Sequence, residues 1–143
     1  MAAFNIVSET NRTRTPLKIL FDFLGDFKNF ETILPVDRVS GFEFSGDACS
    51  FNIQGITRLK VSLVEKIPFE YLVFKSEGLA SFNFILKVHF MGEPGNAGEC
   101  RIELSGDMNP FIRSMAEKPL TGLVNAMSLR LSELELNQTI NKQ

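Results

Sequence analysis

The chain has 143 residues, of which 44% are hydrophobic and 22% are charged, a composition typical of a globular protein with a sizeable core. Its formal net charge is −2 and its lysines and arginines are scattered, which argues against nucleic-acid binding because no basic run could follow a phosphate backbone. The N-terminus lacks a signal-peptide pattern and no stretch approaches the ~18 apolar residues of a membrane span, so we expect a cytoplasmic protein without stable membrane insertion.

The aromatic residues are almost all phenylalanine, with 14 Phe, one Tyr and no Trp. Phenylalanine is bulky and carries no polar group, so it fills protein interiors or lines apolar cavities. The excess of phenylalanine therefore predicts a large apolar interior, which is either filled or hollow.

The first part of the chain predicts one strand and two short helices. Residues 3–9 alternate weakly between apolar and polar positions, as a strand does. Thr15 followed by Pro16 has the pattern of an N-cap and a proline at the first helical position, and predicts a helix that ends near residue 24. A second short helix is predicted over residues 26–34.

From residue 36 to about residue 108 the pattern changes to a period of two, which predicts about six strands. Short segments rich in turn-forming residues separate them, such as Ser45-Gly46-Asp47 and the loop at 92–99. Short connections between successive strands are typical of hairpins, so we expect an antiparallel meander.

The strand predicted over residues 80–90, ASFNFILKVHF, has one strongly apolar face. Side chains alternate between the two faces of a strand. One face would carry Phe82, Phe84, Leu86, Val88 and Phe90.

A long C-terminal helix is predicted from residue 110 to about residue 134, because apolar residues recur there at helical spacing. Asn109 and Pro110 form a cap followed by a proline at the first helical position. Pro119 lies inside this segment, so we expect it to kink or divide the helix. The polar residues 137–143 are expected to fray.

Two segments resemble the START-like or SRPBCC superfamily of helix-grip proteins, in particular its polyketide cyclase/dehydrase-like branch. They are FDFLGDFKNFETILP at 21–35 and GDMNPFIRSMAEKPLTGLVNAMSLRL at 106–131. The resemblance implies an α+β fold in which a curved antiparallel sheet of about seven strands wraps around a long C-terminal helix, with two short helices between the first two strands. Residues 1–136 would form a single START-like domain, and 137–143 a polar tail.

The resemblance also implies a cavity between the sheet and the helix that binds a small hydrophobic molecule such as a lipid, a sterol or a polyketide-like compound. Glu65 and Arg113 would be polar groups at its mouth. The expected lining residues are Phe51, Ile53, Leu59, Val61, Leu63, Phe74, Phe82, Phe84, Leu86, Val88, Phe90, Met115, Leu123 and Met127.

No residue pattern predicts a catalytic site, a metal site or a cofactor. His89 is the only histidine, and its alternation with Lys87 places it on the solvent face, opposite the phenylalanines. Cys49 and Cys100 are far apart in sequence and a single histidine cannot complete a metal site with them, so two free thiols are expected.

Three alternatives stay open from the sequence. An enzyme of the cyclase or dehydrase kind would need at least two polar side chains inside the cavity. A chaperone-associated interaction domain would need an exposed apolar patch of several hundred Å² instead, and the protein partner would be unknown. A fully packed core would bind no ligand at all.

Overall fold

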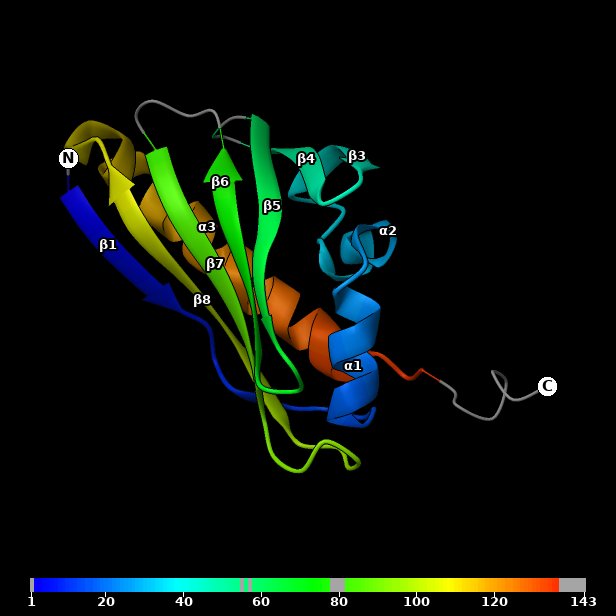
Figure 1. Ribbon diagram of the computed structural model, residues 1–143. Helices are drawn as coiled ribbons and strands as arrows, with labels where there is room; N and C mark the ends of the chain where they lie inside the picture. Colours follow the sequence, from blue (N-terminus) through cyan, green and yellow to red (C-terminus); the bar gives the residue numbers. More distant parts are fainter. Residues whose placement is uncertain (1, 55, 57, 78–81, 137–143) are drawn as a thin grey trace.

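An antiparallel sheet and one long helix make up the frame of the fold (Figure 1). The computed structural model describes residues 2–54, 56, 58–77 and 82–136, without the side chains of Ala2 and Phe82. The predicted polar tail at 137–143 lies outside the described residues.

Eight strands form the sheet, and every neighbouring pair is antiparallel. The spatial order is β1-β8-β7-β6-β5-β4-β3, with the short β2 also paired to β8, so the meander predicted from the short turns is confirmed. The strand β2 was not predicted, because two residues are too few to show an alternating pattern. The strands are β1 (Ala2–Val7), β2 (Asn11–Arg12), β3 (Val39–Ser45), β4 (Ala48–Ile53), β5 (Arg58–Ile67), β6 (Tyr71–Glu77), β7 (Phe82–Met91) and β8 (Glu99–Met108).

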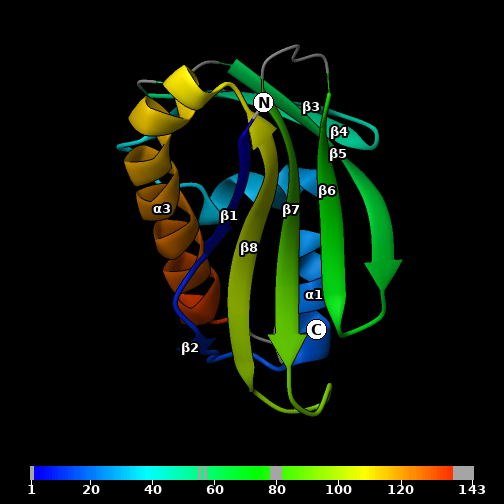
Figure 2. The ribbon, with the colours of Figure 1, turned by 90° about the vertical axis from the view of Figure 1, so that its left-hand side faces the viewer.

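The helices all lie on one side of this sheet (Figure 2). They are α1 (Leu17–Leu24), α2 (Phe27–Phe30), the 3₁₀ turn η1 (Glu31–Ile33) and α3 (Pro110–Glu133). The backbone of α3 packs against β1, β2, β8 and η1. This arrangement is the helix-grip fold, as the resemblance implied.

The helix starts are held by the caps that the sequence predicted, with one exception. The side chains of Asp26 and Asn109 accept hydrogen bonds from the backbone N–H groups two residues later, at 3.1 and 2.8 Å. Thr15 does not cap α1, so that prediction is wrong. Its hydroxyl donates to the carbonyl of Leu134 at 2.7 Å and accepts from the N–H of Leu136 at 2.9 Å, which ties α1 to the segment after α3.

Of the two predicted effects of Pro119, a kink or a division, the division is absent, because α3 is continuous through this residue. Its buried positions recur at helical spacing and face the sheet. They are Ala116, Leu120, Leu123, Val124, Met127, Ser128, Leu131 and Ser132.

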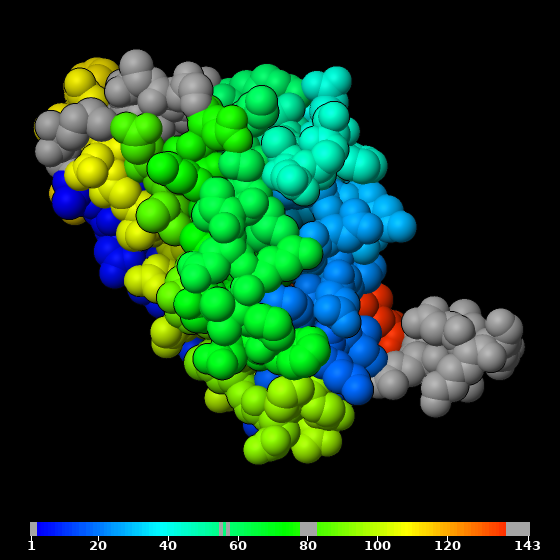
Figure 3. Space-filling view, in the orientation of Figure 1, coloured from blue at the N-terminus to red at the C-terminus, as the bar shows by residue number. Residues whose placement is uncertain are grey.

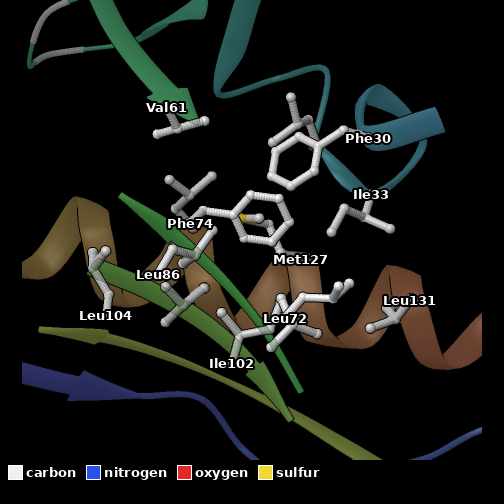
Figure 4. Packing of buried hydrophobic residues seen from close by; sticks show 14 of the residues in the cluster. Phe30, Ile33, Val61, Leu72, Phe74, Leu86, Ile102, Leu104, Met127 and Leu131 are labelled. Atoms are coloured by element: carbon white, nitrogen blue, oxygen red, sulfur yellow. The ribbon is translucent and has the colours of Figure 1, made fainter. Parts of the chain in front are cut away.

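One core fills the space between the sheet and the helices (Figure 4). Phe30, Phe74, Leu86 and Met127 point into it from α2, β6, β7 and α3. The opposite face of the sheet forms a continuous surface that hides most of α3 (Figure 3). The predicted phenylalanine-rich face of β7 is therefore the inner face.

Candidate functional site

The inner face of the sheet and α3 enclose a small apolar cavity of about 20 Å³. Its lining side chains come from β4, β5, β7, β8 and α3. They are Phe51, Ile53, Leu59, Val61, Phe84, Leu86, Leu104, Leu120, Leu123, Val124 and Met127.

The size of this cavity shows how closely the interior is packed. A volume of about 20 Å³ has room for about one water molecule, and the lining offers it no polar side chain. This cavity is thus too small for a lipid-sized molecule, and a guest that entered it would have to move the side chains that line it.

Eight of the predicted lining residues surround this cavity: Phe51, Ile53, Leu59, Val61, Phe84, Leu86, Leu123 and Met127. Three further residues, Leu104, Leu120 and Val124, were not predicted. The sequence contained patterns that could have identified them. Leu104 is two residues after Ile102 and so lies on the same face of the strand, and Leu120 and Val124 belong to the same apolar helical stripe as Leu123.

Three other predicted lining residues are buried away from the cavity. Phe74 makes an edge-to-face contact with Phe30, with ring centroids 5.1 Å apart. Phe90 lies against Phe21 of α1, with ring centroids 5.8 Å apart. Val88, two residues before Phe90 on β7, is fully buried on the same inner face. Side chains of the short helices therefore fill the part of the interior around Phe74 and Phe90.

The remaining three apolar predictions have different outcomes. Leu63 is half-buried and does not line the cavity, and the side chain of Phe82 lies outside the described part of the structure. Met115 is 57% exposed, so the prediction that it faces the sheet is wrong. Each helical residue turns the side chain by about 100°. Met115 directly precedes the buried Ala116 and is turned to the outside.

Glu65 does not reach the cavity because of a β-bulge in β5. Leu63 is opposite Phe74 and Glu65 is opposite Val73, which leaves Val64 as the extra residue. One extra residue reverses which face the following side chains point to. Glu65 is exposed for this reason, and its predicted place at the cavity mouth is wrong.

A larger, open groove of about 790 Å³ adjoins the cavity. Ile53 lines both hollows and stands between them. The other groove residues come from the segments next to β3 and β4 and from the middle of α3: Arg38, Gln54, Glu117, Lys118, Pro119, Thr121, Gly122 and Asn125. No local sequence pattern marks this set, because its members are distant in sequence and unlike in chemistry.

Arg113 was predicted at the cavity mouth and lies beside the groove without lining it. Its Nη2 atom is 3.5 Å from the Oε2 atom of Glu117, one helical turn away. Glu117 does line the groove. Arg113 thus pairs with a carboxylate that lines the groove.

His89 lies on the outer face of the sheet, as its alternation predicted, and lines neither hollow. Its Nε2 atom is 3.2 Å from the Oε1 atom of Glu103. Desolvation by burial lowers the pKa of His89, and the hydrogen bond to Glu103 opposes this effect. The only histidine is therefore on the wrong side of the sheet to act in the interior.

The two cysteines are free and buried, on β4 and β8. These strands are separated by β5, β6 and β7, which places the thiols roughly 19 Å apart along the sheet. A disulfide needs Cα atoms within about 7 Å, so the two cannot pair. Burial raises the pKa of Cys49 to about 12 and that of Cys100 to about 11.

Within the described ranges, no three His, Cys, Asp or Glu side chains come together in a way that would hold a metal ion. Neither α3 nor any shorter helix there combines the length and the hydropathy of a membrane-spanning segment.

Comparison with solved structures shows proteins of the same fold. Norcoclaurine synthase from Thalictrum flavum is 12% identical with a TM-score of 0.69, and the match covers 92% of this chain and 85% of that one. A START superfamily protein from Mycobacterium smegmatis is 10% identical with a TM-score of 0.64, over 89% of this chain and 96% of that one.

A third match is the di-domain ARO/CYC BexL from the BE-7585A biosynthetic pathway, at 17% identity and a TM-score of 0.64. It covers 91% of this chain, which spans about half of BexL, at 49% of its length. No protein-family model matches the sequence. No curated protein matches it either. At these identities the shared feature is the fold, and the START-like resemblance is confirmed at that level.

Proposed function

We propose that the protein binds a small molecule with an apolar body between the sheet and α3. The observation that carries this proposal is the uniform lining of the inner cavity, where every lining side chain is apolar and the set spans sheet and helix. Burial of apolar surface contributes about 25 cal/mol per Å² before entropic costs. Proteins described as a START superfamily protein and as an ARO/CYC share the fold, which supports a lipid-, sterol- or polyketide-like guest.

The guest enters from the groove, past Ile53. The backbone of α3 is packed against β1, β2, β8 and η1, whereas the groove lies where α3 faces the ends of β3 and β4. We therefore expect α3 to separate from the sheet at this side. Met127 lines the cavity, and its unbranched side chain adapts its shape to a guest more readily than a branched one.

Catalysis inside the cavity is the less favoured alternative. A cyclase or dehydrase mechanism needs acid–base groups beside the substrate, and the cavity lining contains no titratable side chain. An interaction domain is also less favoured, because the exposed apolar residues of the described strands and helices are spread over β1, β3, β5, β7 and α3, where Phe111 and Met115 lie one helical turn apart. Single exposed apolar residues are common on protein surfaces.

A cytoplasmic location belongs to the same proposal. Free thiols are typical of a reducing compartment, and the two cysteines are unpaired and too far apart to pair with each other.

The test is a fluorescence titration with N-phenyl-1-naphthylamine, a neutral apolar dye. We expect saturable binding with one site and a micromolar Kd. Leu123→Phe places a larger ring in the cavity and should weaken binding by about tenfold or more.

Leu131→Phe is the matched control, since Leu131 is buried on the same helix and does not line the cavity. Leu131→Phe enlarges a side chain of the same buried helix face without filling the cavity, so a loss of affinity in Leu123→Phe alone reports on the cavity. Absence of saturable binding to the unmodified protein, or equal effects of the two variants, would contradict the proposal.

A further inference from the structure

The groove beside the cavity carries an excess of positive charge. Among its lining residues, the carboxylate of Glu117 is already paired with Arg113 at 3.5 Å. Arg38 and Lys118 line the same groove, and neither makes an ion pair with another described residue. Two cations are thus left to face whatever occupies the groove.

The exposed side chain of Arg38 lies against a glycine of α3. A Cβ atom at Gly122 would lie 2.5 Å from Nη1 and 3.0 Å from Cζ of Arg38, closer than such atoms approach. The guanidinium therefore lies against the helix backbone at Gly122, and it would have to shift to make room for a larger residue there. Its planar set of N–H donors suits a carboxylate or another oxyanion.

The position of this guanidinium matters because the groove and the cavity share Ile53. A guest whose apolar body lies in the cavity would leave its other end in the groove, near Arg38. An apolar molecule with no polar end would leave the guanidinium of Arg38 without an anionic partner.

We propose that the guest is amphipathic and anionic: a small apolar molecule that carries one acidic group, with this group bound by Arg38. This inference rests on the proposed function and narrows its ligand class. Lys118 adds positive charge to the same groove, and its flexible side chain makes it the weaker determinant.

The experiment uses two dyes with one skeleton. N-phenyl-1-naphthylamine is neutral, and 8-anilino-1-naphthalenesulfonate carries one sulfonate. Arg38→Gln should weaken binding of the sulfonate dye by about tenfold and leave binding of the neutral dye within about twofold. Arg14→Gln removes one positive charge outside the groove and should change neither.

Gly122→Ala is a second variant, and it favours folding because alanine has a higher helix propensity than glycine. Its methyl group displaces the guanidinium of Arg38 and should weaken only the sulfonate dye. Gly122→Ala changes the position of the guanidinium and keeps its charge, whereas Arg38→Gln removes the charge. The two variants therefore distinguish the effect of position from the effect of charge.

The outcomes distinguish the two proposals. If neither dye binds the unmodified protein, the proposed function itself fails. If both dyes bind and Arg38→Gln weakens neither, or weakens both equally, the anionic ligand class is overturned while apolar binding stands.

Discussion

At the scale of single residues, the burial of the two thiols should make the stability of the folded protein depend on pH. Burial raises the pKa of Cys49 to about 12 and that of Cys100 to about 11, from 9.0 for an ordinary thiol. Above pH 9.0 the unfolded chain loses these protons while the folded chain keeps them. The folded state then binds more protons, so its stability must fall as the pH rises.

We predict that the free energy of unfolding decreases above about pH 9, by up to about 1.4 kcal/mol per pH unit for each thiol. Urea unfolding at several pH values between 8 and 10.5 measures the slope. The Cys49→Ala/Cys100→Ala double variant provides the comparison, because its slope should be shallower by the thiol contribution. Equal slopes would show that the thiols are accessible in the folded protein.

At the scale of elements, α1 and α2 fill much of the concave side of the sheet. Phe27 and Phe30 lie against Phe74 with ring centroids 5.7 and 5.1 Å away, and Phe21 packs on Phe90 and Phe69 at 5.8 and 5.5 Å. These helices therefore determine how much of the interior is left for a guest.

Phe30→Ala should lower the free energy of unfolding by about 3 to 5 kcal/mol, because Phe30 is fully buried and its loss leaves a cavity. Phe111→Ala is the control on α3, where the side chain is 71% exposed and the expected change is within about 0.5 kcal/mol. Denaturant unfolding of the two variants measures both values. A small effect of Phe30→Ala would show that the short helices are loosely attached to the sheet.

At the scale of the whole molecule, the alternation of the strands and the caps of the helices predicted the elements and their order, and the resemblance to the START-like superfamily implied how they pack. The short turns fixed the order of the meander, and the inner face of β7 was identified by its phenylalanines. The wrong predictions for Glu65 and Met115 come from local features that the spacing of apolar residues does not reveal. The bulge at Val64 reverses the face of Glu65, and the apolar residue Met115 is one position outside the buried stripe.

The site was predicted only in part, for a related reason. Alternation identifies which side chains point inward but not what they contact, so Phe74 and Phe90 could not be assigned to the helices. The groove could not be predicted at all, since Arg38 and Gly122 meet only in the folded chain.

The central claim is that an apolar guest enters the interior between the sheet and α3. The most direct measurement is an NMR titration of the protein, labelled with ¹³C in its methionine methyl groups, with N-phenyl-1-naphthylamine. Met127 lines the cavity and Met115 is exposed on the outside of the same helix, so the two report on different locations. We predict that the Met127 resonance shifts with saturation while that of Met115 stays in place. A shift of Met115 with no change at Met127 would show surface binding and contradict the account.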